Sequence, residues 1–282
     1  MLVVAVTSLK GGVGKTSVTL GLASAAVEHG LTTLVVDLDP QGDATMALQP
    51  QPARAAVADV LADPAPTTVQ AAIAASTWVD TGLDVIIGTE RSIEHDRAGD
   101  QVDHLRAALA TTVGYDLALV DCPPSLGALT RTGLVAADRA LVVTEPGLFA
   151  VMAVSRALRT IDELRRGPAP NLQPLGIVVN RVRARSTEQS YRLAELEQMY
   201  GPLVLSPTVP ERAALQQAQG AARPIHAWPG NPAHELSAAF DQLLERALRA
   251  GRQASHGHGD APQRDMPQHV EVPHRASAEL PV

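Results

Sequence analysis

The sequence predicts an α/β protein with a mostly parallel, twisted sheet of about seven strands and helices on both faces. The first observation is that short apolar runs alternate with longer helical stretches, which is typical of parallel strands joined by crossover helices. The second is that 45% of residues are hydrophobic and only 2% are aromatic, so the core must be built from Ala, Val and Leu. The third is that glycine-rich and acidic segments follow three of the apolar runs, where parallel sheets bind ligands.

The expected strands are short, apolar and bounded by turn residues. They cover residues 2–7, 33–37, 84–87, 117–121, 140–144, 175–179 and 203–205. Helical stretches lie between most of them. The first starts at Thr16 and ends near Gly30, and an amphipathic one over 235–249 closes the domain. These elements predict one folded domain over 1–250.

A glycine-rich loop follows the first strand, and it carries both lysines of the chain, Lys10 and Lys15. A strand, a glycine-rich turn and a helix form the context that a phosphate-binding loop requires. Glycines let successive N–H groups face one anion, and the helix N-terminus adds partial positive charge. We expect Lys15 to reach the β- and γ-phosphates and the Thr16 hydroxyl to bind Mg²⁺. The predicted nucleotide contacts of this loop are Gly11, Gly12, Val13, Gly14, Lys15, Thr16 and Ser17.

Carboxylates end two further apolar runs. Asp37 and Asp39 are one residue apart, so they lie on the same side of an extended chain and can handle Mg²⁺ and water together. Asp121 ends the strand expected over 117–121, where an aspartate can hold Mg²⁺ through water. The next residue, Cys122, is expected to be a small apolar filler.

These three segments resemble the deviant Walker A ATPases of the ParA/MinD family, which have the P-loop NTPase fold. The first matches the family's Lys-Gly-Gly-x-Gly-Lys-Thr, and Cys-Pro-Pro-Ser-Leu-Gly after Asp121 looks like its switch II. The second is similar to Asp-x-Asp-Pro-Gln-Gly-Asn-Ala-Thr, with Asp43 in place of asparagine. The resemblance implies an ATPase that closes a homodimer around ATP, with Lys10 reaching the partner's phosphates. It also implies that Asp39 positions the attacking water and that Asp37 supports the metal site.

The resemblance places base recognition late in the chain. An asparagine at the end of the corresponding strand contacts adenine in the wider family, which makes Asn180 a candidate. The loop 206–211 corresponds to a family segment whose backbone lines the base, so Pro207, Val209 and Pro210 are also candidates. The alternative is an ordinary loop without a role in binding.

The family also binds DNA without sequence preference, and a ParB-like or other adaptor protein triggers hydrolysis. The net charge of −7 opposes DNA binding overall, so a local basic patch is required. Arg183, Arg185 and Arg212 are the candidate DNA-binding residues. Two arginines of the family's DNA segment are replaced here by Glu211 and Ala214. A solvated arginine face is the alternative.

Other functions of the same superfamily make different demands on the sequence. A MinD-like membrane ATPase needs a basic amphipathic helix at the C-terminus, where residues 272–282 contain prolines instead. A tyrosine kinase needs a C-terminal tyrosine cluster, but the last tyrosine is Tyr200. An iron–sulfur ATPase needs paired cysteines, and Cys122 is the sole cysteine. A metabolic P-loop ligase or synthetase stays open.

The two ends of the chain bear on its location. Met1 leads directly into an apolar strand without a signal peptide, and no apolar run reaches the roughly 20 residues of a membrane span. We therefore expect a cytoplasmic, nucleoid-associated protein that does not bind a membrane. Residues 251–282 are rich in Pro, His, Gln and Gly, and are expected to be a disordered tail.

Overall fold

The computed structural model describes residues 1–78, 82–97 and 101–256. Within these residues, seven strands form one sheet in the order β3-β4-β2-β5-β1-β6-β7. Neighbouring strands are parallel except β3 and β4, which are antiparallel. The predicted mostly parallel sheet is therefore confirmed. The strands are β1 (Leu2–Thr7), β2 (Thr33–Asp37), β3 (Ile73–Ala75), β4 (Leu83–Ile86), β5 (Leu117–Asp121), β6 (Arg139–Thr144) and β7 (Gln173–Val179).

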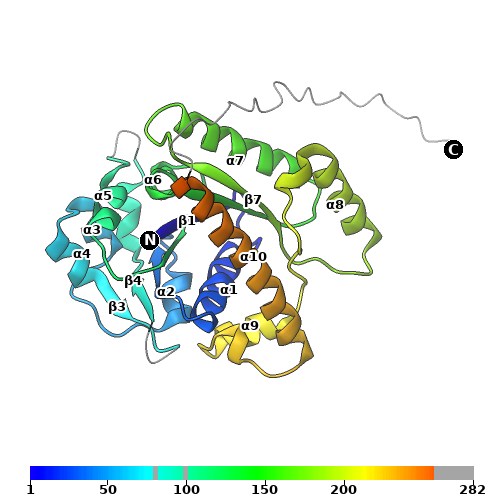
Figure 1. Cartoon of the computed structure of the whole chain (residues 1–282), viewed down its shortest axis with the longest axis horizontal. Helices are drawn as coiled ribbons and strands as arrows, with labels where there is room; N and C mark the ends of the chain where they lie inside the picture. The colour runs from blue at the N-terminus through cyan, green and yellow to red at the C-terminus, as the bar shows by residue number, and fades with distance from the viewer. Residues whose placement is uncertain (79–81, 98–100, 257–282) are drawn as a thin grey trace.

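Helices cover both faces of the sheet (Figure 1). Side chains alternate along each strand, so Val3 packs into the core on one face and Val4 into the core on the other. One face carries α1 (Lys15–Glu28), α2 (Asp43–Leu48), α9 (Ala213–Gly220) and α10 (Asn231–His256). The other carries α3 (Val57–Ala62), α4 (Pro66–Ala72), α5 (His104–Ala110), α6 (Ala128–Ala136), α7 (Ala150–Arg165) and α8 (Thr187–Tyr200). Short 3-10 helices are η1 (Glu90–His95), η2 (Gly201–Leu203) and η3 (Ile225–Ala227).

The helix that follows the glycine-rich loop is buried on most sides between the sheet and α10 (Figure 1). Small residues allow this close packing. At Gly21 an added Cβ would lie 2.3 Å from Cζ of Phe240, a fully buried side chain of α10. The aromatic ring of α10 therefore occupies the space that a side chain on α1 would need, and α1 is held firmly in place.

One predicted strand is wrong, and one strand of the sheet was not predicted. Residues 203–205 do not form a strand: η2 ends at Leu203, and Val204 makes an isolated bridge with Ile177. Pro202 and Pro207 flank this segment, and neither can donate to a ladder of hydrogen bonds. The seventh strand is instead β3, which has three residues and is antiparallel to β4. Its alanine-rich sequence favours the end of a helix over a strand.

The last helix is longer than the sequence predicts. The amphipathic pattern indicates a helix over 235–249, but α10 continues from Asn231 to His256. It therefore extends beyond residue 250, where the predicted domain ends. The remainder of the predicted tail, 257–282, lies outside the described residues.

The topology brings the sequence motifs together. β1 lies between β5 and β6, and β5 lies between β1 and β2. Asp37 and Asp121 are register partners at the ends of β2 and β5, and Val6 of β1 pairs with Asp121. Parallel strands present their carboxyl ends at one edge, so the glycine-rich loop and both acidic motifs meet there.

Candidate nucleotide site

The loop between β1 and α1 has the backbone of a phosphate cradle. Gly12 and Gly14 have φ values of 81° and 84°, a left-handed conformation that L side chains rarely adopt. Gly14 caps α1, and its carbonyl accepts from the Val18 N–H at 3.0 Å. The first N–H groups of α1 are therefore available to an anion.

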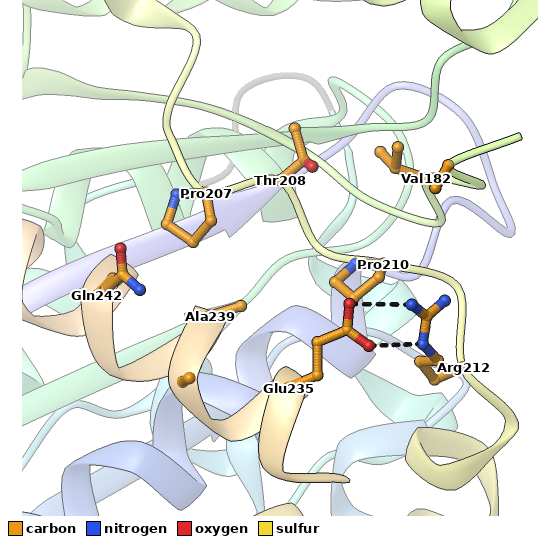
Figure 2. A pocket seen from close by; sticks show the side chains of 10 residues that line it. Val182, Pro207, Thr208, Pro210, Arg212, Glu235, Ala239 and Gln242 are labelled. Carbon is orange, nitrogen blue, oxygen red and sulfur yellow. Dashed lines mark hydrogen bonds and ion pairs between the residues drawn. The ribbon is translucent and has the colours of Figure 1, made fainter. Parts of the chain in front are cut away.

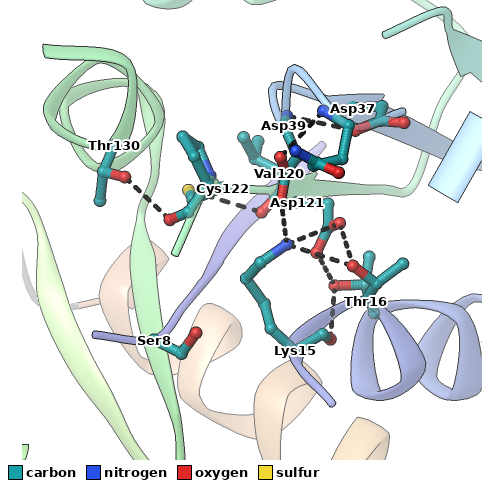
Figure 3. A network of polar contacts seen from close by, with 12 residues as sticks. Ser8, Lys15, Thr16, Asp37, Asp39, Val120, Asp121, Cys122 and Thr130 are labelled. Atoms are coloured by element: carbon teal, nitrogen blue, oxygen red, sulfur yellow. Dashed lines mark hydrogen bonds and ion pairs between the residues drawn. The ribbon is translucent and has the colours of Figure 1, made fainter. Parts of the chain in front are cut away.

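Lys15 lies at the centre of a buried polar network (Figure 3). Its Nζ is 2.8 Å from Oδ2 of Asp121 and 3.4 Å from Oδ2 of Asp39. The Thr16 hydroxyl donates to Oδ2 of Asp121 at 2.8 Å. The Thr19 hydroxyl donates to the other oxygen, Oδ1, at 2.7 Å. Lys15 and Thr16 of the glycine-rich loop are thus joined to the aspartate that ends β5.

Burial and neighbouring charges both shift pKa values in this network. Burial is the largest effect on Lys15 and opposes its charge, but Asp121 and Asp39 outweigh it, so the pKa of Lys15 lies above its ordinary value. Burial, reinforced by the charge of Asp121, raises the pKa of Asp37 to about 7. Burial also raises the pKa of the Cys122 thiol to about 12, so this cysteine is a protonated core residue.

Asp37 is less exposed to the phosphate loop than the sequence suggests. It is fully buried, and its carboxylate accepts hydrogen bonds from Thr45 and from the Asp39 N–H. Asp43, the acidic substitution in this motif, is exposed in the first turn of α2, where a negative charge suits the helix dipole. The Asp43 side chain is therefore not part of the buried polar network around Lys15.

A cavity of about 270 Å³ lies beside the start of α1. Its lining residues are Ser17, Asn180, Arg181, Pro210, Glu211, Arg212, Ala213, Leu215 and Gln216. Three of the predicted nucleotide residues, Ser17, Asn180 and Pro210, therefore meet at one cavity next to the phosphate loop. Asn180 is 2% exposed, and its Nδ2 donates to the Val13 carbonyl at 2.8 Å.

The other two residues predicted for the base lie elsewhere. Pro207 lines a neighbouring cavity of about 330 Å³ between its loop and α10 (Figure 2). Pro210 and Arg212 line both cavities, so the two share a wall. Val209 is fully buried, and its N–H donates to the Val179 carbonyl at 2.9 Å. The side chain of Val209 therefore belongs to the core.

The first lysine of the loop occupies a different environment from the second. The Lys10 side chain is 57% exposed, against 6% for Lys15. Its Nζ forms an ion pair with Glu145, which follows β6. Sequence reasoning missed Glu145, because nothing in the local pattern links it to a loop 135 residues earlier. It also missed Thr19, for which the spacing of one helical turn from Thr16 is a usable signal.

The three candidate DNA-binding arginines differ in their surroundings. Arg183 pairs with Glu211, and Arg212 pairs with Glu235 through two hydrogen bonds of 2.7 and 2.9 Å (Figure 2). Arg185 is exposed and takes part in none of the ion pairs among the described residues.

Ala214, one of the positions where the family has arginine, is 7% exposed on α9. This position therefore faces the core and contributes nothing to a basic surface.

The donor set suits Mg²⁺ bound together with phosphate. No group of three His, Cys, Asp or Glu side chains in the described residues is placed to hold a metal alone. Mg²⁺ usually keeps several waters and takes few protein ligands besides the substrate phosphates. The Thr16 hydroxyl and Oδ2 of Asp121, 2.8 Å apart at the phosphate loop, match that requirement.

Among the described helices, none is long and apolar enough to cross a membrane.

A phosphate loop, a buried lysine and an aspartate on the adjacent parallel strand define a P-loop ATPase. A family model described as an AAA domain matches residues 1–173. The chain is 31% identical to the chromosome-partitioning ATPase Soj of Thermus thermophilus, over 88% of this chain and 97% of that relative. It is 30% identical to the chromosome partitioning protein ParA of Caulobacter vibrioides, over 79% and 85%. The chain belongs to the ParA/MinD family of ATPases, as its motifs predict.

Solved structures agree with this assignment. Cobyrinic acid a,c-diamide synthase from Mycobacterium smegmatis, with bound ATP analog and magnesium, matches with a TM-score of 0.72 and 29% identity, over 89% of this chain and 96% of that one. The cell division ATPase MinD of Pyrococcus furiosus matches with a TM-score of 0.69 and 25% identity, over 88% and 98%. The shared architecture extends over most of the described chain.

Proposed function

We propose that this chain is a ParA-type partition or positioning ATPase. In this proposal ATP closes a homodimer, the dimer binds DNA without sequence preference, and hydrolysis releases it. The observation that carries the proposal is the pair of lysines in one loop. Lys15 is buried and pairs with Asp121 of the same chain, whereas Lys10 is at the surface. The match to Soj over 97% of that relative supports the same function.

The proposed substrate is ATP with Mg²⁺, and the reaction is phosphoryl transfer to water. Lys15 exchanges the carboxylates of Asp121 and Asp39 for the β- and γ-phosphates, so its charge offsets the charge that develops on the γ-phosphate. Thr16, and Asp121 through water, would hold Mg²⁺, which neutralises phosphate charge when bound. Asp39, freed from Lys15, orients the attacking water.

Lys10 acts in trans in this proposal. Its ammonium belongs to the loop that cradles the phosphates but points to the surface, where it pairs with Glu145. An exposed ion pair contributes little to stability, so exchanging Glu145 for the partner's phosphates costs little. ATP sandwiched between two copies would satisfy Lys10 and thereby favour the dimer.

DNA is the proposed matrix. Arg185 is the strongest candidate contact because it is exposed and takes part in none of the ion pairs among the described residues. Arg183 and Arg212 would have to leave Glu211 and Glu235 to meet phosphates. A ParB-like or other adaptor protein is the proposed stimulator of hydrolysis. The cytoplasm, on the nucleoid, is the corresponding location, with a chromosome, a plasmid or a protein assembly as cargo.

Binding to random-sequence duplex DNA tests this proposal. The assay compares ATP, ADP and no nucleotide at two salt concentrations, with Arg185→Ala beside the wild type. We expect binding only with ATP, weakened by salt and by the substitution, because each phosphate contact releases counterions. Absence of binding in every state would contradict DNA as the matrix, and would leave the ATPase site unaffected.

A second candidate function has one observation in its favour. The structural neighbour with a bound ATP analog is named as a diamide synthase, and it is 29% identical over 89% of this chain. An ATP-dependent amide synthesis would consume ATP only with its acid substrate. Buried Cys122 could not serve as a nucleophile in it, because burial raises the pKa of its thiol to about 12. ADP formation that needs a carboxylic acid and not DNA or a partner would favour this candidate.

A further inference from the structure

The loop that carries Asp39 is held at both ends by a single carboxylate. Asp37, fully buried at the end of β2, accepts the Asp39 N–H at Oδ1 over 3.2 Å. Its Oδ2 accepts from the Thr45 N–H at 2.8 Å and from the Thr45 hydroxyl at 2.7 Å. Residues 39–45 therefore begin and end on the two oxygens of one side chain.

The segment that follows β4 closes the same junction from the other side. The Thr45 hydroxyl accepts from the Gly88 N–H at 2.8 Å, so it is both a donor and an acceptor. An added Cβ at Gly88 would lie 2.6 Å from Cγ of Asp37 and 2.8 Å from its Oδ2. A glycine is needed here because the backbone approaches the carboxylate so closely.

We propose that Asp37, Thr45 and Gly88 form a clamp that positions the Asp39 carboxylate for hydrolysis. Inside the loop, Oδ1 of Asp39 accepts from the Gln41 N–H at 3.1 Å, and the Asp39 carbonyl accepts from the Gly42 N–H at 2.9 Å. The direction of the carboxylate thus depends on the path of the loop, which the clamp fixes. Oδ2 of Asp39 then faces Lys15 at 3.4 Å.

The same contacts separate Asp37 from the residues that face the phosphate loop. Three protein hydrogens occupy the Asp37 oxygens, whereas Asp121 contacts Lys15 and Thr16 directly. A carboxylate whose oxygens accept hydrogen bonds from backbone N–H and hydroxyl groups holds the surrounding residues in place. Asp37 and Thr45 are therefore positioning residues, which act on the reaction through Asp39. The inference rests on the proposed role of Asp39 in orienting water.

The test is single-turnover ATP hydrolysis by the full chain, with fluorescent ATP-analog binding measured in parallel. Thr45→Val removes the hydroxyl at nearly constant shape, Thr45→Ser keeps it, and Gly88→Ala pushes on Asp37 from the opposite side. We expect Thr45→Val and Gly88→Ala to lower the rate constant roughly 10- to 100-fold, since small misplacements have effects of that size. Analog affinity should stay within about threefold, and Thr45→Ser should stay near the wild-type rate.

Thr68→Val is the matched control, because the Thr68 hydroxyl also bonds an aspartate, Asp63, at 3.1 Å on an exposed surface. It should leave the rate unchanged. A wild-type rate for Thr45→Val, or a loss shared by Thr45→Ser and by analog binding, would overturn the clamp. Asp39→Ala in the same assay separates the two proposals. If it hydrolyses ATP normally, the role of Asp39 fails; if it is inactive while Thr45→Val is normal, only the clamp fails.

Discussion

The phosphate loop and the arginine surface, which consists of Arg183 and Arg212, both pair cations with carboxylates. The pairs of the phosphate loop are buried, whereas those of the arginine surface are partly exposed. Lys15 is buried with Asp121 at 2.8 Å, whereas Arg212 meets Glu235, whose side chain is 50% exposed. A buried charge that loses its partner is costly, so the Lys15 network requires a replacement anion before it opens. An exposed pair exchanges with solvent at little cost. The phosphate loop is therefore selective for an anion that can replace two carboxylates, and the arginine surface is adjustable.

The largest effect is expected at Asp39, the residue proposed to orient the attacking water. Asp39→Ala should keep ATP bound but lower hydrolysis by roughly 100- to 10,000-fold, the range for losing a group that acts on the attacking nucleophile. Quantifying phosphate release and bound nucleotide on the same sample checks this. Normal hydrolysis by the variant would mean that another residue orients the water.

A smaller but still large effect is expected at the buried lysine. Lys15→Ala should weaken ATP binding about 100-fold, roughly 3 kcal/mol, because charge-assisted bonds to the phosphates are lost. Titration calorimetry with ATP and Mg²⁺ measures the change. Lys10→Ala is the internal control from the same loop, and it should bind ATP like the wild type. Equal losses in both variants would remove the distinction between a buried and an exposed lysine.

Removing the acids that pair with the arginine surface should strengthen DNA binding, whereas the substitutions above weaken hydrolysis or ATP binding. Glu211→Gln and Glu235→Gln each free an arginine, and should strengthen ATP-dependent DNA binding several-fold at low salt. Glu188→Gln removes the same charge from α8 but leaves Arg192 paired with Glu195, so it serves as the matched control. If all three variants bind alike, Arg183 and Arg212 are merely a solvated face.

The smallest effect is expected on the stability of the fold, at the partly exposed carboxylate of Asp59. Asp59 accepts from the Ala56 N–H at 2.9 Å, and this bond, helped by Arg91, holds the pKa of Asp59 below its ordinary value. A depressed carboxyl pKa stabilises the fold above the unfolded pKa of about 4, and the contribution is lost as pH falls through the folded pKa. Asp59→Asn should therefore cost about 1 kcal/mol or less at pH 7, and less than that near pH 2. Urea unfolding at both values measures the difference, and a cost that persists at low pH would contradict this account.

The sequence predicted which residues of the buried network lie together better than it predicted the exposed ion pairs. Lys15, Thr16 and Asp121 could be placed because a strand end and a helix start leave little freedom. Glu145 and Glu235 could not, because ion pairs between distant segments leave no local pattern.

Strand prediction failed where backbone donors, not hydrophobicity, decided the outcome. Residues 203–205 are apolar enough for a strand, but the flanking prolines restrict them to a single bridge. Asp37 shows the same limit within the site: its position was predicted, but its bonds to Thr45 depend on how α2 packs.

Dimerisation tests the central claim most directly. The mass of Asp39→Ala in solution, measured by light scattering with ATP and with ADP, should double only with ATP. Adding Lys10→Ala to this variant should abolish the doubling while ATP stays bound. A dimer that forms without ATP, or that forms equally well without Lys10, would contradict the ATP-sandwich account of this protein.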